Sequence, residues 1–343
     1  MKFQKYPSIE NSYRKEFIQH VIDENKTDGL WVVTEKIHGA NFSFWCNKRE
    51  VRMAKRSCLL PDDANFYGSQ KVWKELASKV MNLFLLINGY NMERLPKEMR
   101  KKHNPENIAV FGEIFGGNYP HPKVEADPGA RQVQKGIYYC PDNQFLIFDL
   151  MIDSKFVSFA EIQVYCEAVG LPYIKALATG TFEECLKHKN KFSSTIHKYY
   201  HLPKIKDNIC EGIVIRPNKP KFLYRGSRVM LKSKNAKWSE KVGARRSATP
   251  ISISEEGEKV KEEIRSMITE NRYNSVVSKI GEVTAGHFGE IMKDFSKDIL
   301  DEAYKSELAY QFNALDKNEQ KIIKKSMNHN IANLVRQKLI LGK

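Results

Sequence analysis

The sequence predicts an α+β protein, in which a large domain built on antiparallel sheets precedes a small all-α domain. Up to about Lys241, short apolar segments alternate with turn residues, which is typical of antiparallel sheets with a few packed helices. From residue 260 onward, apolar residues recur at helical spacing. Between these regions, residues 243–254 lack helical periodicity and contain Pro250. We therefore expect domains at 1–242 and 255–343, joined by a linker at 243–254.

The elements of the large domain follow from the lengths of its apolar runs and the turn residues that bound them. Strands are expected over 30–33, 41–46, 51–54, 108–112, 145–149, 213–216 and 228–231. Helices are expected over 72–87, 160–169 and 181–189. The polar stretch 88–107 carries several basic residues and is interpreted as a surface loop that faces water.

The C-terminal helices are predicted from groups of apolar residues spaced three and four apart. These groups lie at 260–268, 276–280, 291–295 and 323–334. Together they predict a module of roughly ninety residues that contains helices only.

Composition and charge narrow the classes of function. Lys and Arg outnumber Asp and Glu by 56 to 41, and the formal net charge of +15 would attract a phosphate backbone, although it also suits a solvated basic surface. The six cysteines form no C-x-x-C pair, which argues against a disulfide framework and a cysteine zinc site. The most apolar stretch, 80–87, is far shorter than a membrane span. We expect a soluble, monomeric, intracellular protein without membrane contact, in the cytoplasm or in an organelle.

Lys36 is the candidate nucleophile. It follows an apolar strand, and Gly39, three residues later, permits a tight turn in which backbone can approach a nucleotide. A lysine amine attacks only after it has lost its proton, which nearby cations favour. Lys232 and Lys234 lie at the end of a predicted strand, where their spacing directs both side chains to one face. The K-x-x-G pattern alone is weak, because an exposed lysine before a turn is common.

A series of further segments in fixed order supports the nucleophile. These segments are VRMAKRS at 51–57, FGEIFG at 111–116, FLIFD at 145–149, EGIVIR at 211–216 and VMLKSK at 229–234. Their order after Lys36 resembles the covalent nucleotidyltransferase superfamily of ligases and messenger-RNA capping enzymes. EKIHGANFS at 35–43, AKRS at 54–57 and NAKWSEK at 235–241 resemble the family of the second phage T4 RNA ligase and the trypanosome RNA-editing ligases. Residues 271–282 resemble the start of the helical C-terminal domain of that phage enzyme.

The resemblance implies an ATP-grasp-like ligase domain and a reaction in three steps. Lys36 would attack the α-phosphate of ATP to form a covalent lysyl-AMP, and the AMP would pass to an RNA 5′-phosphate. A 3′-hydroxyl would then displace AMP and form the phosphodiester bond. The implied cofactors are ATP and Mg²⁺, with Mn²⁺ as an alternative ion. The implied substrate is a nick in bridged duplex RNA, in RNA repair or editing.

The resemblance also implies roles for residues around the nucleotide. Glu35 would contact the adenine through its backbone or side chain, and Ile37 would line the nucleotide site. Phe148 would stack on the adenine. Lys232 and Lys234 would cover the α-phosphate and stabilise its developing charge.

A second group of residues would serve the metal and the RNA. Glu113 and Glu211 would contact the ribose or hold Mg²⁺, and Glu211 would also be catalytic. Arg56 would bind the phosphates or the RNA 5′ end. Asn41 is a candidate substrate or metal contact, and His38 would serve ligation rather than adenylylation of the lysine. Taken singly, Glu113 and Glu211 could be strand-edge carboxylates, Phe148 a core aromatic and Arg56 a surface cation.

Three alternatives share part of this pattern. A DNA ligase or a capping guanylyltransferase would share Lys36, but both usually continue into an OB-fold barrel, whereas 255–343 has a helical pattern. A non-catalytic RNA-binding protein with the same fold would form no labelled protein with α-labelled ATP and Mg²⁺.

His197 and His201, four residues apart, lack a third metal ligand and are interpreted as surface histidines.

Overall fold

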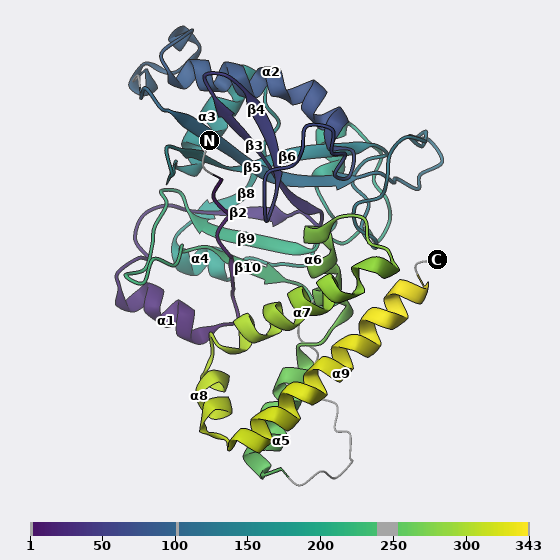
Figure 1. Ribbon diagram of the computed structural model, residues 1–343. Helices are drawn as coiled ribbons and strands as arrows, with labels where there is room; N and C mark the ends of the chain where they lie inside the picture. The colour runs from purple at the N-terminus through teal and green to yellow at the C-terminus, as the bar shows by residue number, and fades with distance from the viewer. Residues whose placement is uncertain (1–2, 101–102, 239–252, 342–343) are drawn as a thin grey trace. The chain divides into compact units, whose positions relative to one another are not determined.

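The computed structural model describes residues 3–100, 103–238 and 253–341. The chain divides into two compact units, Met1–Lys237 and Trp238–Lys343 (Figure 1). The predicted linker lies outside the described residues over 243–252, so the exact domain boundary stays a prediction. Among the described residues, no helix is both long enough and apolar enough to cross a membrane.

The described residues of unit 1 form two five-stranded sheets. Sheet A has the order β1 (Glu10–Asn11), β10 (Leu231–Lys234), β9 (Gly212–Pro217), β2 (Trp31–Lys36), β8 (Ala176–Gly180). Sheet B has the order β4 (Val51–Lys55), β3 (Ala40–Asn47), β5 (Asn107–Gly116), β6 (Asn143–Ile152), β7 (Lys155–Phe156). All strand pairs are antiparallel except the short β1 beside β10.

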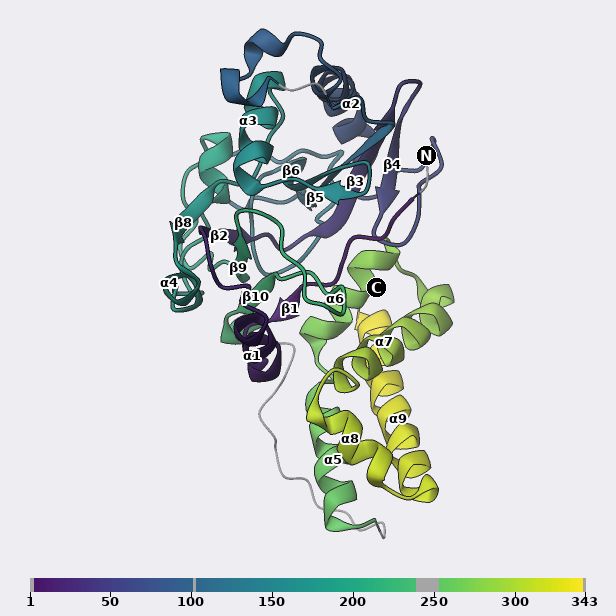
Figure 2. The same cartoon turned by 90° about the vertical axis from the view of Figure 1, so that its left-hand side faces the viewer.

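Helices cover the outer faces of the two sheets (Figures 1 and 2). α2 (Ser69–Ile87) and α3 (Phe159–Val169) pack on sheet B, where Phe42 and Val110 are buried beneath them. α1 (Lys15–Asp23) and α4 (Phe182–Leu186) pack on sheet A, against Trp31. Side chains alternate along a strand, so the remaining faces of the sheets are turned toward each other.

The β2–β3 connection carries the chain from one sheet to the other. β2 ends at Lys36 in sheet A, and β3 begins at Ala40 in sheet B. Because only three residues connect the strands, the end of β2 and the start of β3 must lie close together. They therefore fix Lys36 at the point where the two sheets meet.

Every regular element among the described residues of unit 2 is a helix. Its elements are α5 (Glu255–Ser266), α6 (Glu270–Ile280), η5 (Ala285–His287), α7 (Phe288–Ala303), α8 (Glu307–Ala314) and α9 (Lys317–Leu341). Ile291, Phe295 and Ile331 are fully buried in its core. The predicted α+β class with an all-α C-terminal region is thereby confirmed.

Several element boundaries differ from those predicted. The strand expected at 228–231 begins only at Leu231, because Val229 bonds to Lys221 and the Met230 carbonyl accepts from Glu10 instead of joining the ladder with β9. The helix expected at 181–189 ends at 186, as α4. Where the structure describes the stretch 88–107, it contains two short 3₁₀ turns, η1 (Met92–Arg94) and η2 (Lys97–Met99). His197 and His201 lie in and directly after η3 (Ile196–Tyr200). α1, β8 and α8 were not predicted.

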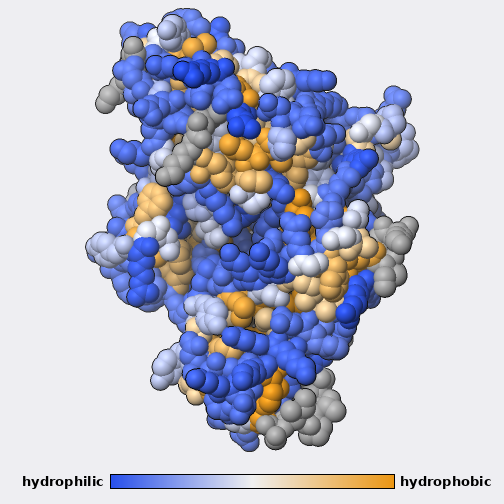
Figure 3. Space-filling model, in the orientation of Figure 1, coloured by the Kyte–Doolittle hydropathy of each residue, from blue (hydrophilic) through white to orange (hydrophobic). Residues whose placement is uncertain are grey.

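Hydrophilic side chains dominate the face drawn in Figure 3. Apolar side chains on that face gather over the part of unit 1 where β3 and β5 lie in Figure 1.

The formal net charge of +15 falls mostly within residues 1–237. Unit 1 therefore carries nearly all of the attraction for a polyanion.

Candidate active site

Lys36 is paired with a buried carboxylate across sheet A. Its Nζ lies 2.8 Å from Oε2 of Glu211, and its side chain is 20% exposed against 2% for Glu211. The other carboxylate oxygen, Oε1, lies 2.8 Å from Nζ of Lys234. One buried carboxylate thus holds two amines that both reach toward solvent.

The strand register explains why these groups meet. Lys36 on β2 and Lys234 on β10 both lie opposite Gly212, the first residue of the central strand β9. Glu211 directly precedes Gly212, so its side chain lies between the two lysines. A Cβ on Gly212 would collide with the carbonyl of Ser233, which makes glycine necessary for this close approach.

His38 completes this group. Its Nδ1 lies 3.4 Å from Oε2 of Glu211, within the turn that follows Lys36. Burial would raise the pKa of Glu211, but Lys234, Lys36 and His38 outweigh it and hold that pKa well below the usual range. Burial lowers the pKa of His38 against the opposing effect of Glu211. At neutral pH the group therefore contains an ionised carboxylate and a neutral imidazole.

Glu113 approaches the same turn from sheet B. It lies opposite Asn41 in the β3–β5 pair, and its carboxylate accepts a hydrogen bond from the backbone N–H of Gly39. Burial raises its pKa to about 7, with Lys36 and Arg56 opposing that rise and Glu211 adding to it. A Cβ on Gly39 would collide with the Ile114 carbonyl, so this position also needs glycine.

Tyr139 holds the turn after Lys36 from outside the predicted motifs. Its buried hydroxyl oxygen accepts a 2.8 Å hydrogen bond from the backbone N–H of His38. Gln134 Nε2 donates to the Gly39 carbonyl at 3.4 Å. Both residues lie between β5 and β6, in a segment without strand or helix periodicity, so no sequence pattern indicated either role.

Glu35 is buried and points away from Glu211. Its carboxylate accepts hydrogen bonds from the Ser194 hydroxyl at 2.6 Å and from the backbone N–H and hydroxyl of Thr195, both at 2.7 Å. Burial raises its pKa, and these donors oppose that rise. Because the side chain is engaged, the backbone of Glu35 is the group better placed to meet a nucleotide. The adjacent Ile37 is buried as well.

The remaining predicted residues lie on the faces that the sheets turn toward each other or at their margins. Lys232 lies two residues before Lys234 on the same face of β10. Phe148 on β6 is half-buried, with its ring centroid 5.2 Å from that of Tyr6. Arg56, just after β4, is half-buried and donates to Ser8 Oγ at 3.4 Å. Lys36, His38, Glu113, Glu211 and Lys234 form the centre, and the charge of Arg56 acts on it through Glu113.

A divalent metal ion fits Glu113 better than Glu211. Each oxygen of Glu211 is already in contact with an amine. Glu113 is half-buried, and its pKa is raised chiefly by loss of solvent, with Lys36 and Arg56 compensating only in part. A hard cation with water ligands would supply further positive charge beside the turn.

A second charged cluster joins the two sheets. Asp149 on β6 is fully buried and binds Arg216 of β9 at 3.1 Å, Arg228, and the hydroxyl of Tyr6 at 2.7 Å. Arg216 also donates to the Phe148 carbonyl at 2.7 Å. This cluster fixes the backbone next to Phe148 and ties sheet B to sheet A.

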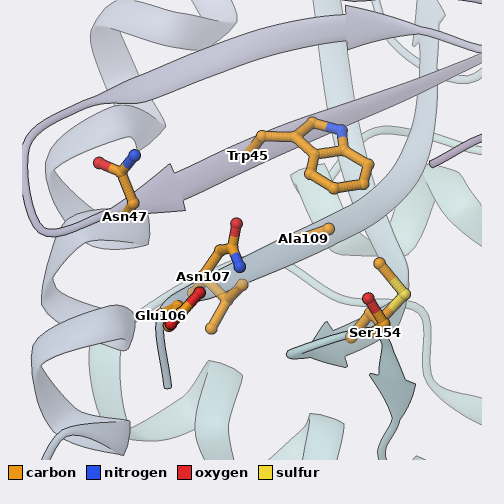
Figure 4. A pocket seen from close by; sticks show the side chains of 8 residues that line it. Trp45, Asn47, Glu106, Asn107, Ala109 and Ser154 are labelled. Atoms are coloured by element: carbon orange, nitrogen blue, oxygen red, sulfur yellow. The ribbon is translucent and has the colours of Figure 1, made fainter. Parts of the chain in front are cut away.

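The surface hollow drawn in Figure 4 is separate from this site. Trp45, Asn47, Asn107 and Ser154 line it, at the ends of β3 and β5 farthest from Asn41 and Glu113. Six residues of strand separate the two ends, or roughly 20 Å. The hollow therefore takes no part in chemistry at Lys36.

Comparison with known proteins identifies related chains. The family model described as RNA ligase matches residues 29–234, and the model described as T4 RNA ligase 2 C-terminal matches residues 251–333. The mitochondrial RNA-editing ligase 2 of Trypanosoma brucei brucei is 27% identical over 242 residues, which are 62% of this chain and 55% of the relative. The mitochondrial RNA-editing ligase 1 of the same organism is 27% identical over 217 residues, 54% of this chain and 44% of the relative. The chain thus spans about half the length of these relatives.

Solved structures show a weaker likeness. A mutant RNA ligase of Naegleria gruberi with AMP and Mn has a TM-score of 0.44 and 14% identity, over 69% of this chain and 57% of that one. The same ligase with PPi has a TM-score of 0.42 and 14% identity, over 69% and 57% of the two chains. These TM-scores are too low to support a family assignment, which therefore rests on the sequence matches.

Proposed function

The chain belongs to the RNA ligase family of the second T4 RNA ligase and the trypanosome editing ligases, and from this premise we propose that it is an ATP-dependent RNA ligase. It joins a 3′-hydroxyl to a 5′-phosphate on RNA. The observation that carries the proposal is the Lys36 amine, held 2.8 Å from the ionised Glu211 beside a second amine on Lys234.

In the first step, the Lys36 nitrogen attacks the α-phosphorus of ATP. A phosphorus–nitrogen bond forms, and the bond to the pyrophosphate oxygen breaks. The amine must lose its proton, and its partial exposure gives that proton a path to water. Glu211 orients the nitrogen, while Lys234 on the other side of β9 is close enough to stabilise charge that develops on the α-phosphate.

In the later steps, the AMP moves from Lys36 to the RNA 5′-phosphate, and the 3′-hydroxyl displaces it. Arg56 would bind the 5′-phosphate, a role supported by the effect of its charge on Glu113. His38 is neutral and lies beside the nucleophile, where it can orient the RNA end. Phe148 offers a half-buried ring for stacking on adenine, and Lys232 extends the cationic face of β10.

Mg²⁺, or Mn²⁺ in its place, would neutralise phosphate charge when bound. Glu113 is the residue that would hold it, with Asn41 opposite in the strand pair as a further oxygen ligand. Glu211 would contribute only after Lys36 or Lys234 has moved away from it.

The substrate we propose is a nick in duplex RNA bridged by a complementary strand, acted on by a monomer. A duplex presents phosphates on both strands, and the charge of unit 1 suits such a polyanion. We place the reaction inside the cell, where ATP and RNA ends occur together.

The test is transfer of label from α-labelled ATP to the protein, followed by sealing of matched RNA and DNA nicks. Wild type should become labelled with ATP and not with GTP, and should seal the RNA nick faster than the DNA nick. Lys36→Ala should abolish labelling. Labelling of Lys36→Ala would reject the nucleophile, labelling with GTP would favour a capping enzyme, and preference for the DNA nick would favour a DNA ligase.

A further inference from the structure

Residues 187–206, here called the lysine segment, carry a run of exposed positive charge in unit 1 that no acidic residue interrupts. The segment contains six lysines and three histidines and neither Asp nor Glu. All six lysine side chains are exposed: Lys187, Lys189, Lys191, Lys198, Lys204 and Lys206. Within the part of the chain that the structure describes, none of them forms an ion pair with a carboxylate.

The inner side of the lysine segment is anchored beside the active site. Asn190 donates to the Ser233 hydroxyl at 3.0 Å and to the Lys234 carbonyl at 3.1 Å. Ser194 and Thr195 hold the buried carboxylate of Glu35, directly before the nucleophile. The anchors thus engage the neighbours of both lysines that contact Glu211.

Further contacts stiffen the rest of the segment. The Phe192 carbonyl accepts from the backbone of Cys210, and the backbone of Ser194 donates to the Asn208 carbonyl at 2.9 Å. Tyr119 donates its hydroxyl to the Pro203 carbonyl at 2.5 Å. The exposed lysines therefore project from a backbone that is fixed before any ligand binds, which reduces the entropy lost on binding.

We infer that the lysine segment is a binding surface for the phosphate backbone of the RNA substrate, outside the nucleotides that react. This inference rests on the proposed ligase function. Unpaired lysines spread over twenty residues suit a long polyanion better than a single pyrophosphate, which two or three cations would neutralise. Lysine contacts to phosphate carry no base preference, so the surface would hold duplexes of any sequence.

The hydrogen bonds of Asn190 and Ser194 determine where the lysine segment lies relative to the active site. A duplex held along the lysine segment would have its reacting end near Lys36, because Asn190 and Ser194 lie against the residues around the nucleophile. Each lysine that contacts a phosphate displaces condensed counterions, so affinity should depend steeply on salt.

The test compares variants by the slope of log affinity against log salt, measured by fluorescence anisotropy with a nicked RNA duplex. In the first variant, four lysines of the segment become glutamine: Lys189→Gln, Lys191→Gln, Lys198→Gln and Lys204→Gln. The matched control removes four exposed lysines elsewhere in unit 1: Lys74→Gln, Lys97→Gln, Lys155→Gln and Lys219→Gln. A third variant replaces the same four segment lysines with arginine, which keeps the charge.

The segment variant should reduce the magnitude of the slope by about 2 to 4, since each lost phosphate contact removes about 0.9 from it. The control should change it by less than about 1, and the arginine variant should keep the wild-type slope. A segment variant with the slope of wild type would overturn the inference. Loss of slope in the arginine variant would also overturn it, because charge would then not be the cause.

Label transfer from ATP separates this inference from the function on which it rests. Failure of wild type to form lysyl-AMP would reject the ligase function itself. Labelling and nick sealing by wild type, with an unaltered slope in the segment variant, would reject only the binding surface. Loss of labelling in the segment variant would show that the segment acts through Glu35 on the nucleotide site, and would overturn the inference too.

Discussion

Among the described residues of unit 1, two buried carboxylates each bind two cations, and their surroundings differ. Glu211 contacts Lys36 and Lys234, whose side chains are 20% and 10% exposed. Asp149 contacts two arginines, each with a side chain only 3% exposed, and the hydroxyl of Tyr6. For both carboxylates, burial raises the pKa and the cations lower it by more. Each cluster sets one negative charge between two positive ones, yet of the two only the Glu211 cluster can open toward water.

The identity of the cations explains the difference. An arginine guanidinium stays protonated and offers a fixed set of donors, so it suits a permanent connection such as the one between the sheets. An amine can lose its proton and turn toward another group, which a nucleophile requires. Arg228 is further enclosed by Phe156, whose ring centroid lies 3.8 Å from its Cζ. We interpret the Asp149 cluster as structural and the Glu211 cluster as chemical.

Lys36→Arg should produce the largest effect that distinguishes the clusters. Arginine keeps the positive charge beside Glu211 but cannot supply a neutral nitrogen for attack. Label transfer from ATP should fall at least about 1,000-fold, as expected for loss of a nucleophile. Urea unfolding should show a nearly unchanged free energy of unfolding. A variant that still forms a covalent nucleotide, or that unfolds far more easily, would remove the distinction.

Removal of each carboxylate should give the next largest effect, which is a loss in the free energy of unfolding. Asp149→Ala leaves two enclosed guanidinium groups without a counter-charge and should lower the free energy of unfolding by about 3 to 5 kcal/mol. Glu211→Ala leaves two amines that can reach water, so we expect less than half of that loss. Urea denaturation of both variants at pH 7 measures the two values, with Asp149→Asn as a milder companion. Equal losses would mean that the Glu211 cluster is as enclosed as the Asp149 cluster.

Sequence patterns could predict the strands that form the clusters but not all the contacts within them. Lys36, Glu211 and Lys234 lie in motifs at strand ends, where periodicity fixes the face and the chain order is informative. Tyr139, Ser194 and Thr195 lie in irregular segments, and their roles depend on hydrogen bonds over as many as 160 residues of sequence. The short elements β8 and α8 were missed for a related reason, since their burial depends on partners distant in the chain.

A third buried carboxylate, Glu35, sharpens the comparison because its partners are neutral. Hydroxyl and amide donors from Ser194 and Thr195 replace the cations, and burial leaves its pKa raised instead of lowered. The folded state therefore favours the protonated form of Glu35. Its contribution to stability is fully present below the unfolded pKa near 4.5 and is lost as pH rises through the higher folded value. Asp149 has the opposite sign, since its lowered pKa gives stability that is lost as pH falls.

Urea unfolding from pH 4.5 to 8 should separate Glu35, which titrates in the folded state above its usual pKa, from Asp149, which does not titrate in this range. The stability of wild type relative to Glu35→Gln should fall as pH rises, because glutamine does not titrate and wild type must ionise a buried group. The stability of wild type relative to Asp149→Asn should stay constant over the same range, since Asp149 remains ionised throughout it. If the stability of wild type relative to Glu35→Gln instead rose with pH, the Ser194 and Thr195 donors would outweigh burial. Neutral hydrogen bonds would then stabilise a buried charge here as cations do at Asp149.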